Sequence, residues 1–301
     1  MYYQCLNTLV IAFFFMIFAS CNNSSGKKTE EVHATANGKE GAGNFNFTKP
    51  IAKWVLPDQL KEISGIVKLD SNQIMAIEDL HAALYVLNLD DGKATIANTI
   101  PFYETAKEKI DIEDLAIVGD TVYALWSHGS LFKINDWKNA KQVTEIKTDL
   151  GKENNTEGLA YDPVTGNLLI ACKNKSGEED EKKSTRSVFE YDIKKGTLKT
   201  DPFLLIEKKD LKKMSGDDIK FYPSAIAVHP VTHDVYVLSS KDSKCIAQFT
   251  HDGKLIGFDY LNKDLLLQPE GLCFDAEGNL YISTEGKNGA SPYIYEFSTK
   301  K

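Results

Sequence analysis

The sequence predicts an all-β fold, a five-bladed β-propeller whose last blade is completed by a strand from the N-terminal part of the domain. Three observations predict it. One short segment recurs five times, each copy is followed by further short apolar runs, and the last copy lacks an outer strand that the start of the domain can supply. Repeats of roughly 40 to 50 residues are typical of propellers. A ring of six blades and an open β-sandwich remain as alternatives.

In the repeated segment, a small or acidic residue is followed by Ile or Leu and then by a second apolar residue. Its copies are residues 63–70, 112–119, 156–163, 223–230 and 269–276. The intervals between copies are close to one blade length, except for a longer one that contains the charged run 175–186. Since Lys and Glu are interleaved in this run, we expect a solvated loop there.

Each copy continues as a meander of short strands. In the second copy, for example, further apolar runs follow at 121–126, 130–134 and 141–146. The turns between runs carry Asp, Pro and Gly, the residues that tight hairpins favour. A meander of four short strands is one propeller blade.

The two ends of the domain complement each other. The fifth copy stops after its third strand, at 293–297, whereas an additional strand is predicted at 50–56, just before the first copy. Pairing of these two strands would close the ring and cover two sheet edges that otherwise promote aggregation.

The N-terminal residues predict an exported, lipid-anchored bacterial protein. The apolar run Leu9–Phe18 is shorter than the roughly 20 residues of a membrane-spanning helix, so residues 1–20 are expected to be a lipoprotein signal peptide. The run ends in Ala19-Ser20-Cys21, which resembles a lipobox, and Cys21 would then carry the lipid. Plain secretion and an uncleaved anchor are the alternatives. The expected location is the cell envelope, on the periplasmic side of a membrane or at the cell surface.

Composition divides the remaining chain. Residues 21–46 contain almost no apolar side chains and are expected to form a flexible tether, and residues 47–301 the propeller domain. A net charge of −8 and a pI near 5.4 argue against nucleic acid as a partner. Cys172, Cys245 and Cys273 lack metal-ligand spacing and lie in apolar patterns, so we expect small buried residues; a disulfide between two of them is the alternative.

Propeller geometry brings the starts of the innermost strands to one mouth of the central channel, together with the ends of the second strands. The starts carry Ser64, Glu113, Glu157, Ser224 and Glu270, and the ends carry Glu78 with Asp79, His128, Lys173 and Glu285. Carboxylates around a narrow axis repel one another unless protons or a cation relieve the repulsion. Ca²⁺ favours such oxygen ligands. Alternatively, the three central glutamates pair with backbone N–H groups or with Lys173 and only solvate the mouth.

From about residue 49 to residue 297 the sequence resembles the SdiA-regulated (YjiK-like) family of NHL-related propellers. The resemblance is carried by Ile63–Ile66, Asp111–Leu115, Thr156–Asp162 and Gln268–Asp275. It implies a five-bladed propeller with a calcium site and no established enzymatic activity. Glu113, Glu157 and Glu270 are the first candidates for calcium ligands, with Glu78 and Glu285 behind them, and Ser64, His128, Lys173 and Ser224 are candidates for binding another ligand. Two positions depart from the usual Gly of the repeat, Asp114, which could add a ligand, and Ala225.

Two functions follow from these expectations. The first is a non-catalytic binding module, in which a propeller face holds a protein or small molecule, the lipid contacts the membrane, and calcium has a structural or bridging role. The second is a calcium-dependent hydrolase resembling lactonases or phytases. Because no Ser-His-Asp set is marked by spacing and few basic residues lie near the mouth to receive a phosphate, we expect no catalytic residues and favour binding.

Overall fold

A computed structural model of the chain describes residues 41–43, 45–103, 110–139, 142–174 and 185–299. All of them belong to one compact unit, residues 34–301. The predicted signal peptide, Cys21, most of the predicted tether and the charged run 175–184 lie outside the described residues. Within these ranges no helix has the length and apolar character needed to cross a membrane.

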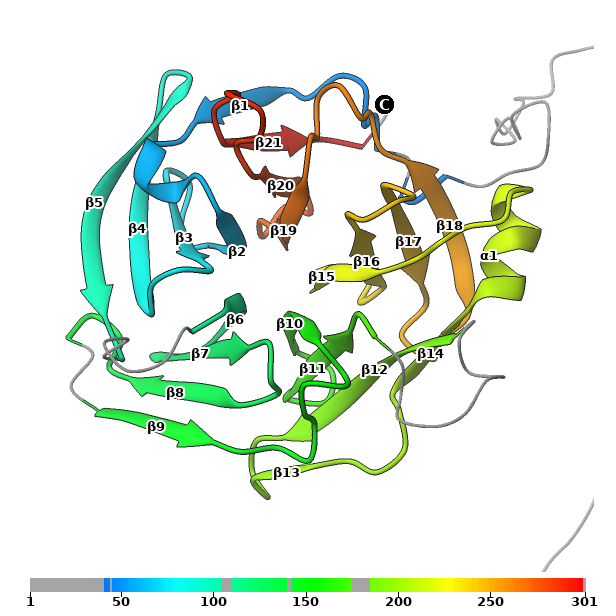
Figure 1. The fold of residues 1–301 in the computed structure, drawn as a ribbon, viewed down its shortest axis with the longest axis horizontal. Coiled ribbons are helices and arrows are strands. Elements are labelled where there is room, and N and C mark those ends of the chain that lie inside the picture. Colours follow the sequence, from blue (N-terminus) through cyan, green and yellow to red (C-terminus); the bar gives the residue numbers. More distant parts are fainter. Residues whose placement is uncertain (1–40, 44, 104–109, 140–141, 175–184, 300–301) are drawn as a thin grey trace, which may run out of the picture. The chain divides into compact units, whose positions relative to one another are not determined.

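The fold is all-β and of the propeller type, built from consecutive antiparallel meanders. Figure 1 shows the first strand of each meander facing a common centre and the later strands lying progressively further out. The second meander forms a sheet of its own, with strands β6 (Ile112–Val118), β7 (Thr121–Trp126), β8 (Leu131–Asn135) and β9 (Gln142–Ile146). The fourth does the same, with strands β15 (Pro223–Val228), β16 (Val235–Ser239), β17 (Cys245–Phe249) and β18 (Leu255–Tyr260).

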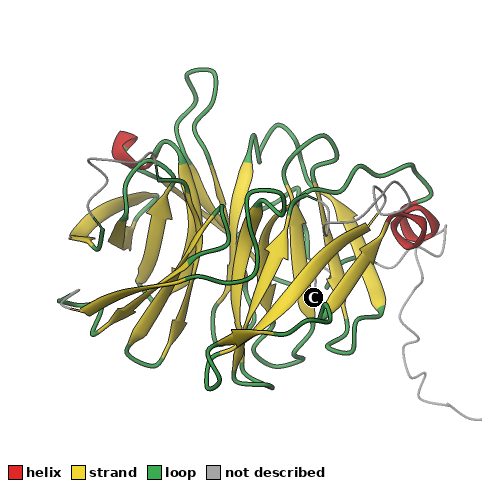
Figure 2. Cartoon of the chain, turned by 60° about the horizontal axis from the view of Figure 1, so that its bottom comes forward, coloured by secondary structure: helices red, strands yellow, loops and turns green. Residues whose placement is uncertain are grey.

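The third meander has an outer strand that is split in two. Its strands are β10 (Thr156–Asp162), β11 (Asn167–Cys172), β12 (Thr185–Asp192), β13 (Thr197–Leu198) and β14 (Leu204–Glu207). Both β13 and β14 pair with β12, at opposite ends of that strand. The helix α1 (Lys208–Ser215) follows and buries Leu211. Figure 2 shows α1 lying outside the strands, which make up most of the described structure. The long interval between the third and fourth copies therefore holds a helix as well as the charged run.

The first and last meanders share one eight-stranded sheet, because the chain returns to its beginning. The first comprises β2 (Ile63–Lys68), β3 (Gln73–Glu78), β4 (Ala83–Asp90) and β5 (Lys93–Pro101), and the last comprises β19 (Pro269–Phe274), β20 (Leu280–Thr284), β21 (Tyr293–Phe297) and β1 (Ala52–Val55). A short 3-10 helix (Asp58–Leu60) connects β1 to β2. Strand β1 pairs antiparallel with β21, from Ala52 opposite Glu296 to Val55 opposite Tyr293. The predicted pairing of the two ends is confirmed.

The packed chain begins earlier than the predicted boundary at residue 47. Ala42 and Phe45 are buried in the core formed by the fourth and last meanders, and Phe45 forms a β-bridge with Thr299. The backbone N–H of Ala42 donates to Asp259 and that of Gly43 donates to Gln248. The expectation that the tether extends to residue 46 therefore does not hold for the described residues 41–43 and 45–46. A few scattered apolar side chains in a polar stretch, such as Ala42 and Phe45, are too weak a signal to reveal this packing.

Close packing of the inner strands explains the small residues at the centre of the repeat. A Cβ atom on Gly158 would lie 2.9 Å from the backbone nitrogen of Ile226 in the next meander. Ala225 replaces the glycine in β15 and is fully buried. The three cysteines are buried free thiols, as predicted, and burial raises the pKa of Cys172 to about 12. Most core side chains lie between neighbouring meanders, so each meander is stabilised by the next.

Candidate functional site

Three of the predicted carboxylates influence one another at one end of the inner strands. Glu113, Glu157 and Glu270 are each the second residue of their strand. Burial raises the pKa of Glu113 well above its usual range, and the charges of Glu157 and Asp111 raise it further. Burial also raises the pKa of Glu270 to about 8, against the lowering effect of Lys173. Because such mutual effects require proximity, these side chains share one mouth. We call Glu113, Glu157, Glu270 and Asp111 the acidic mouth.

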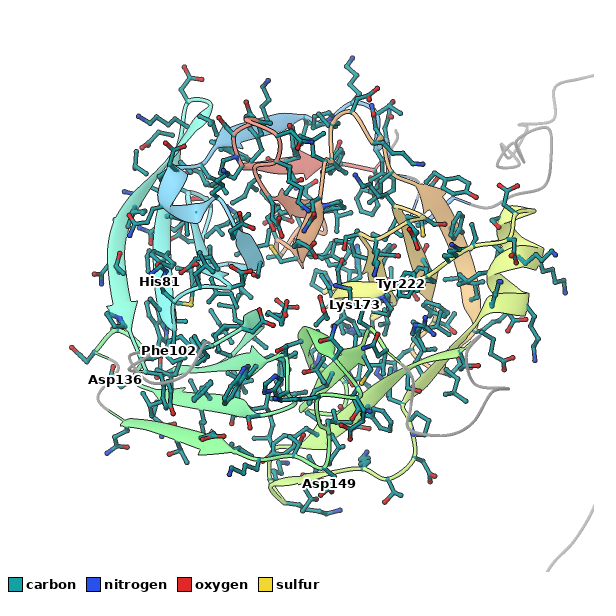
Figure 3. The ribbon with its side chains drawn as sticks, viewed as in Figure 1. His81, Phe102, Asp136, Asp149, Lys173 and Tyr222 are labelled. Carbon is teal, nitrogen blue, oxygen red and sulfur yellow. The ribbon has the colours of Figure 1, made fainter. Side chains whose placement is uncertain are left out.

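Lys173 supplies a positive charge to the acidic mouth. Its Nζ lies 2.9 Å from Oε2 of Glu157, and Figure 3 places Lys173 near the axis, where the inner strands converge. Although burial lowers the pKa of Lys173, the charges of Glu157, Glu270 and Glu113 raise it overall. The Asn155 side-chain amide donates a hydrogen bond to the other oxygen of Glu157, at a distance of 2.5 Å. The alternative expectation, that Lys173 pairs with a central glutamate, is therefore confirmed for Glu157.

Carboxylates beyond the three predicted ones extend the negative charge. Burial, Asp111, Glu62 and Glu78 all raise the pKa of Asp79, to about 6. Burial raises the pKa of Glu285 to about 7; Lys287 lowers it, and Glu62 and Asp79 raise it. The sequence analysis placed both Glu285 and Asp79 at the mouth but chose only Glu285 as a candidate ligand, and it did not place Asp111 or Glu62 there. A period of two would have indicated Asp111, because it precedes Glu113 by two residues and so lies on the same side of the extended chain.

Glu78 is engaged in a local network of the first meander. Its carboxylate accepts hydrogen bonds from the Leu80 N–H at 2.9 Å and from the Tyr85 hydroxyl at 3.1 Å. The His81 Nδ1 lies 2.8 Å from the same carboxylate. These contacts stabilise the turn after β3 and occupy both oxygens, so Glu78 contributes to the acidic mouth mainly through its charge.

The predicted serines and histidine lie in contacts that hold the fold together. The Ser224 hydroxyl donates to the Pro269 carbonyl at 3.3 Å, and the Ser64 carbonyl accepts a hydrogen bond from Ser283 at 3.0 Å. The imidazole of His128 stacks on Trp126 with ring centroids 5.0 Å apart. A ligand-binding role for Ser64, Ser224 and His128 stays a prediction.

Asp114 connects two inner strands, since both of its oxygens accept backbone hydrogen bonds. They come from the N–H of Leu115 at 2.8 Å and from the N–H of Leu159, in the next meander, at 2.7 Å. Asp114 is 1% exposed. The usual Gly is thus replaced by a carboxylate that joins β6 to β10, which leaves it no free oxygen for the suggested role as an additional ligand.

We expect Asp114→Ala to lower the free energy of unfolding by about 2 kcal/mol, because it leaves buried N–H groups without an acceptor. Denaturant unfolding of the protein comprising residues 34–301 measures this loss. Asp120→Ala, in an exposed turn, is the matched control, with an expected change within about 0.5 kcal/mol. Equal stability of the two variants would contradict the bridging role.

The donor type and the charge of the acidic mouth suit a hard cation, but its carboxylates are not arranged as a complete metal site. Among the residues that the structure describes, no three His, Cys, Asp or Glu side chains are already spaced to hold a metal ion. The available donors are carboxylate oxygens, which Ca²⁺ prefers. Burial is the main cause of the raised pKa values of Glu113 and Glu270, and neighbouring carboxylates add to the rise in both groups. Lys173 is the internal competitor that an incoming cation would meet.

Comparison with solved structures supports the propeller fold. Myxococcus xanthus glutaminyl cyclase aligns with a TM-score of 0.58 and 12% identity, over 83% of this chain and 95% of that one. A Bacteroides thetaiotaomicron VPI-5482 protein of unknown function has a TM-score of 0.49 and 15% identity over 86% and 73% of the two chains. Staphylococcus aureus virginiamycin B lyase has a TM-score of 0.44 and 16% identity over 76% of this chain and 66% of that one, just under two thirds of its length.

At 12% identity, the alignment with the glutaminyl cyclase shows similarity of fold alone. No curated protein sequence is significantly similar to this chain. The family model described as SdiA-regulated matches residues 43–288, which include all five repeated segments and the acidic mouth. The chain belongs to the SdiA-regulated family.

Proposed function

We propose that this protein is a cell-envelope binding module, a five-bladed propeller whose acidic mouth binds a calcium ion. The observation that carries the proposal is the gathering of buried carboxylates at the mouth. Burial raises the pKa of Glu270 to about 8, and the charges of Glu157 and Glu285 add to this rise although Lys173 opposes it. Five blades follow if each of the inner strands β2, β6, β10, β15 and β19 begins one blade and β1 completes the last. This count treats the eight-stranded sheet as two blades joined through β1 and β5.

Glu113, Glu270 and Glu157 would hold the ion, with Asp111 and Glu285 nearby. When bound, calcium supplies the positive charge that the mouth lacks. The chain's own residues orient the donors: Asn155 fixes one oxygen of Glu157, and Gln268 Nε2 donates to Glu285 at 2.6 Å. Such ordered carboxylates favour binding because less conformational freedom is lost when the ion enters.

The proposed location is a bacterial envelope membrane, through a lipid on Cys21. A protein or a small molecule would be held at a propeller face, and nucleic acid is disfavoured by the net charge of −8. In this arrangement the residues between Cys21 and the packed chain at Gly41 separate the binding face from the lipid.

A calcium-dependent hydrolase is the second candidate, favoured by the raised pKa of Glu270, because a carboxyl group that titrates near neutral pH can act as a general acid or base. Binding is the preferred function, since Lys173 already neutralises Glu157, the most buried of the three glutamates. A screen of lactones and phosphoesters distinguishes the two. Calcium-dependent turnover that Glu270→Gln abolishes in a folded protein would favour the hydrolase.

Stability as a function of pH tests the calcium proposal. The folded-state pKa values of Glu285 and Glu270 are raised to about 7 and about 8, so the folded state holds more protons than the unfolded state between about pH 4.5 and 8. The free energy of unfolding is therefore expected to fall as pH rises through this range. Thermal melting of the 34–301 protein, with calcium removed by a chelator, should show a lower Tm at pH 8.5 than at pH 5.5.

Calcium should restore the lost stability at pH 8.5. At 100 times the dissociation constant the gain is about 2.7 kcal/mol, or roughly 5 to 10 °C in Tm. Magnesium should do less, since it requires a tighter octahedral ligand arrangement. Glu113→Gln should reduce the calcium effect, whereas Asp264→Asn, on an exposed loop, should leave it unchanged. Identical melting curves with calcium and with chelator would overturn the proposal.

A further inference from the structure

The inner strands enclose a second, chemically opposite site at the other end of the channel. A cavity of about 160 Å³ lies there, lined by residues of β2, β6, β10, β15 and β19 that follow the residues of the acidic mouth along each strand. All five strands contribute equivalent positions to it. The cavity therefore lies around the axis, and its lining begins two residues after the glutamates of the inner strands.

Large and small side chains alternate along the cavity wall. The layer nearest the acidic mouth consists of buried Ile and Leu residues, namely Ile66, Leu115, Leu159, Ile226 and Leu272. The next layer is mostly small and opens the space, with Ala116, Ala160, Ala227 and Cys273. The outermost layer is a half-buried apolar rim of Ile117, Tyr161, Val228 and Phe274. Small residues between two layers of large ones leave a pocket that is closed inward and open outward.

No charged side chain lines this cavity. The equivalent rim position in β2 is Lys68, and its ammonium group is engaged elsewhere. It donates to the Ser71 carbonyl at 3.1 Å and lies 5.0 Å from the centre of the Tyr281 ring. The lining side chains therefore offer an ion no charged partner to replace its hydration. They favour an uncharged ligand with an apolar group.

We propose that this cavity, the apolar end of the channel, binds a benzene-sized ring of an uncharged small molecule. Its volume is close to the roughly 150 Å³ of an apolar protein cavity that accepts benzene. The rim lies two residues further along the strand than the closed layer, a depth of about 7 Å. That depth fits one ring and is too short for an extended acyl chain.

Two rim residues favour an aromatic ligand. Tyr161 and Phe274 can contact a ring edge-to-face or offset-stacked, which adds to the gain from area burial. Beside the rim, the exposed side chains of Val164 (53%) and Val231 (66%) extend the apolar surface from the turns after β10 and β15. A larger molecule could therefore insert its ring and lie across these turns. This site does not depend on the proposed calcium function.

Benzene binding to the 34–301 protein tests the proposal. Benzene at ten times its dissociation constant should raise Tm by about 3 °C, and saturation-transfer NMR should show direct contact. Ala160→Leu fills the small layer and should abolish both signals. Should that variant fail to fold, Ala227→Leu fills the same layer from another strand. Octanoate should bind at least tenfold more weakly than benzene.

The controls separate this site from the acidic mouth. Asp264→Asn lies outside the lining, on an exposed loop, and should bind benzene as the unmodified protein does. Glu113→Gln, at the acidic mouth, should also bind it unchanged. The absence of any benzene effect on the unmodified protein would overturn the proposal. So would benzene binding that persists in a folded Ala160→Leu or Ala227→Leu variant, or tighter binding of octanoate.

Discussion

Replacing Lys173 with methionine is expected to lower the free energy of unfolding by about 3 kcal/mol in calcium-free buffer at pH 8. The substitution removes the ammonium group that lies 2.9 Å from Glu157, whose side chain is 6% exposed. Glu157 would then be a buried carboxylate beside Glu113 and Glu270. At pH 5 the loss should be smaller, because Glu157 can take up a proton. Denaturant unfolding at the two pH values measures both effects.

The same variant connects the fold to the proposed ion. Because Lys173 competes with calcium for Glu157, Lys173→Met should bind calcium more tightly and recover most of its stability when calcium is added. Lys199→Met is the matched control: Lys199 lies 2.7 Å from the buried Glu190, a pair that does not involve the acidic mouth. Its stability should not respond more to calcium than that of the unmodified protein. An equal calcium response in both variants would count against a cation site at Lys173.

Replacing Phe45 with alanine should lower the free energy of unfolding by about 4 kcal/mol. Phe45 is 1% exposed, and its ring centroid lies 6.0 Å from that of Phe47 and 6.2 Å from that of Tyr236. Truncation would leave a cavity between the N-terminal segment and the fourth meander. Urea or guanidinium unfolding of the 34–301 protein measures the effect.

Ile51→Ala provides the comparison for Phe45, six residues further along the chain. Ile51 is 59% exposed, so its truncation should change stability by no more than about 0.5 kcal/mol. A protein beginning at residue 47 should be about as unstable as Phe45→Ala. If Phe45→Ala and Ile51→Ala unfold at the same denaturant concentration, the segment before residue 47 would be a tether after all.

The sequence was informative where one pattern repeats. In all five copies of the inner strand, the side chains alternate between the two faces in the same way. This period of two makes each copy recognisable even where the copies share few identical residues. The pairing of β1 with β21 could be predicted because an incomplete blade and an extra strand explain each other. The split outer strand of the third meander was beyond this reasoning. Strand β13 has only two residues, and α1 buries few side chains, among them Leu211.

The site was predictable to the extent that it depends on strand position. Glu113, Glu157 and Glu270 occupy equivalent places in their strands, so the repeat alone brings them together. Asp79 and Glu62 lie at connections between strands, where side-chain direction depends on the local turn and not on a period. Asp114 was misread for another reason. Its role depends on the N–H of Leu159, a partner 45 residues away that only the packed structure brings to 2.7 Å.

The pairing of β1 with β21 has a consequence for biogenesis. Strand β1 leaves the ribosome well before its antiparallel partner β21, in which Glu296 lies opposite Ala52. Contacts between such distant parts of a chain form slowly, because the intervening loop must close first. Until β21 has been made, the two strands cannot pair. A chain that is to be threaded through a membrane before folding would benefit from this delay.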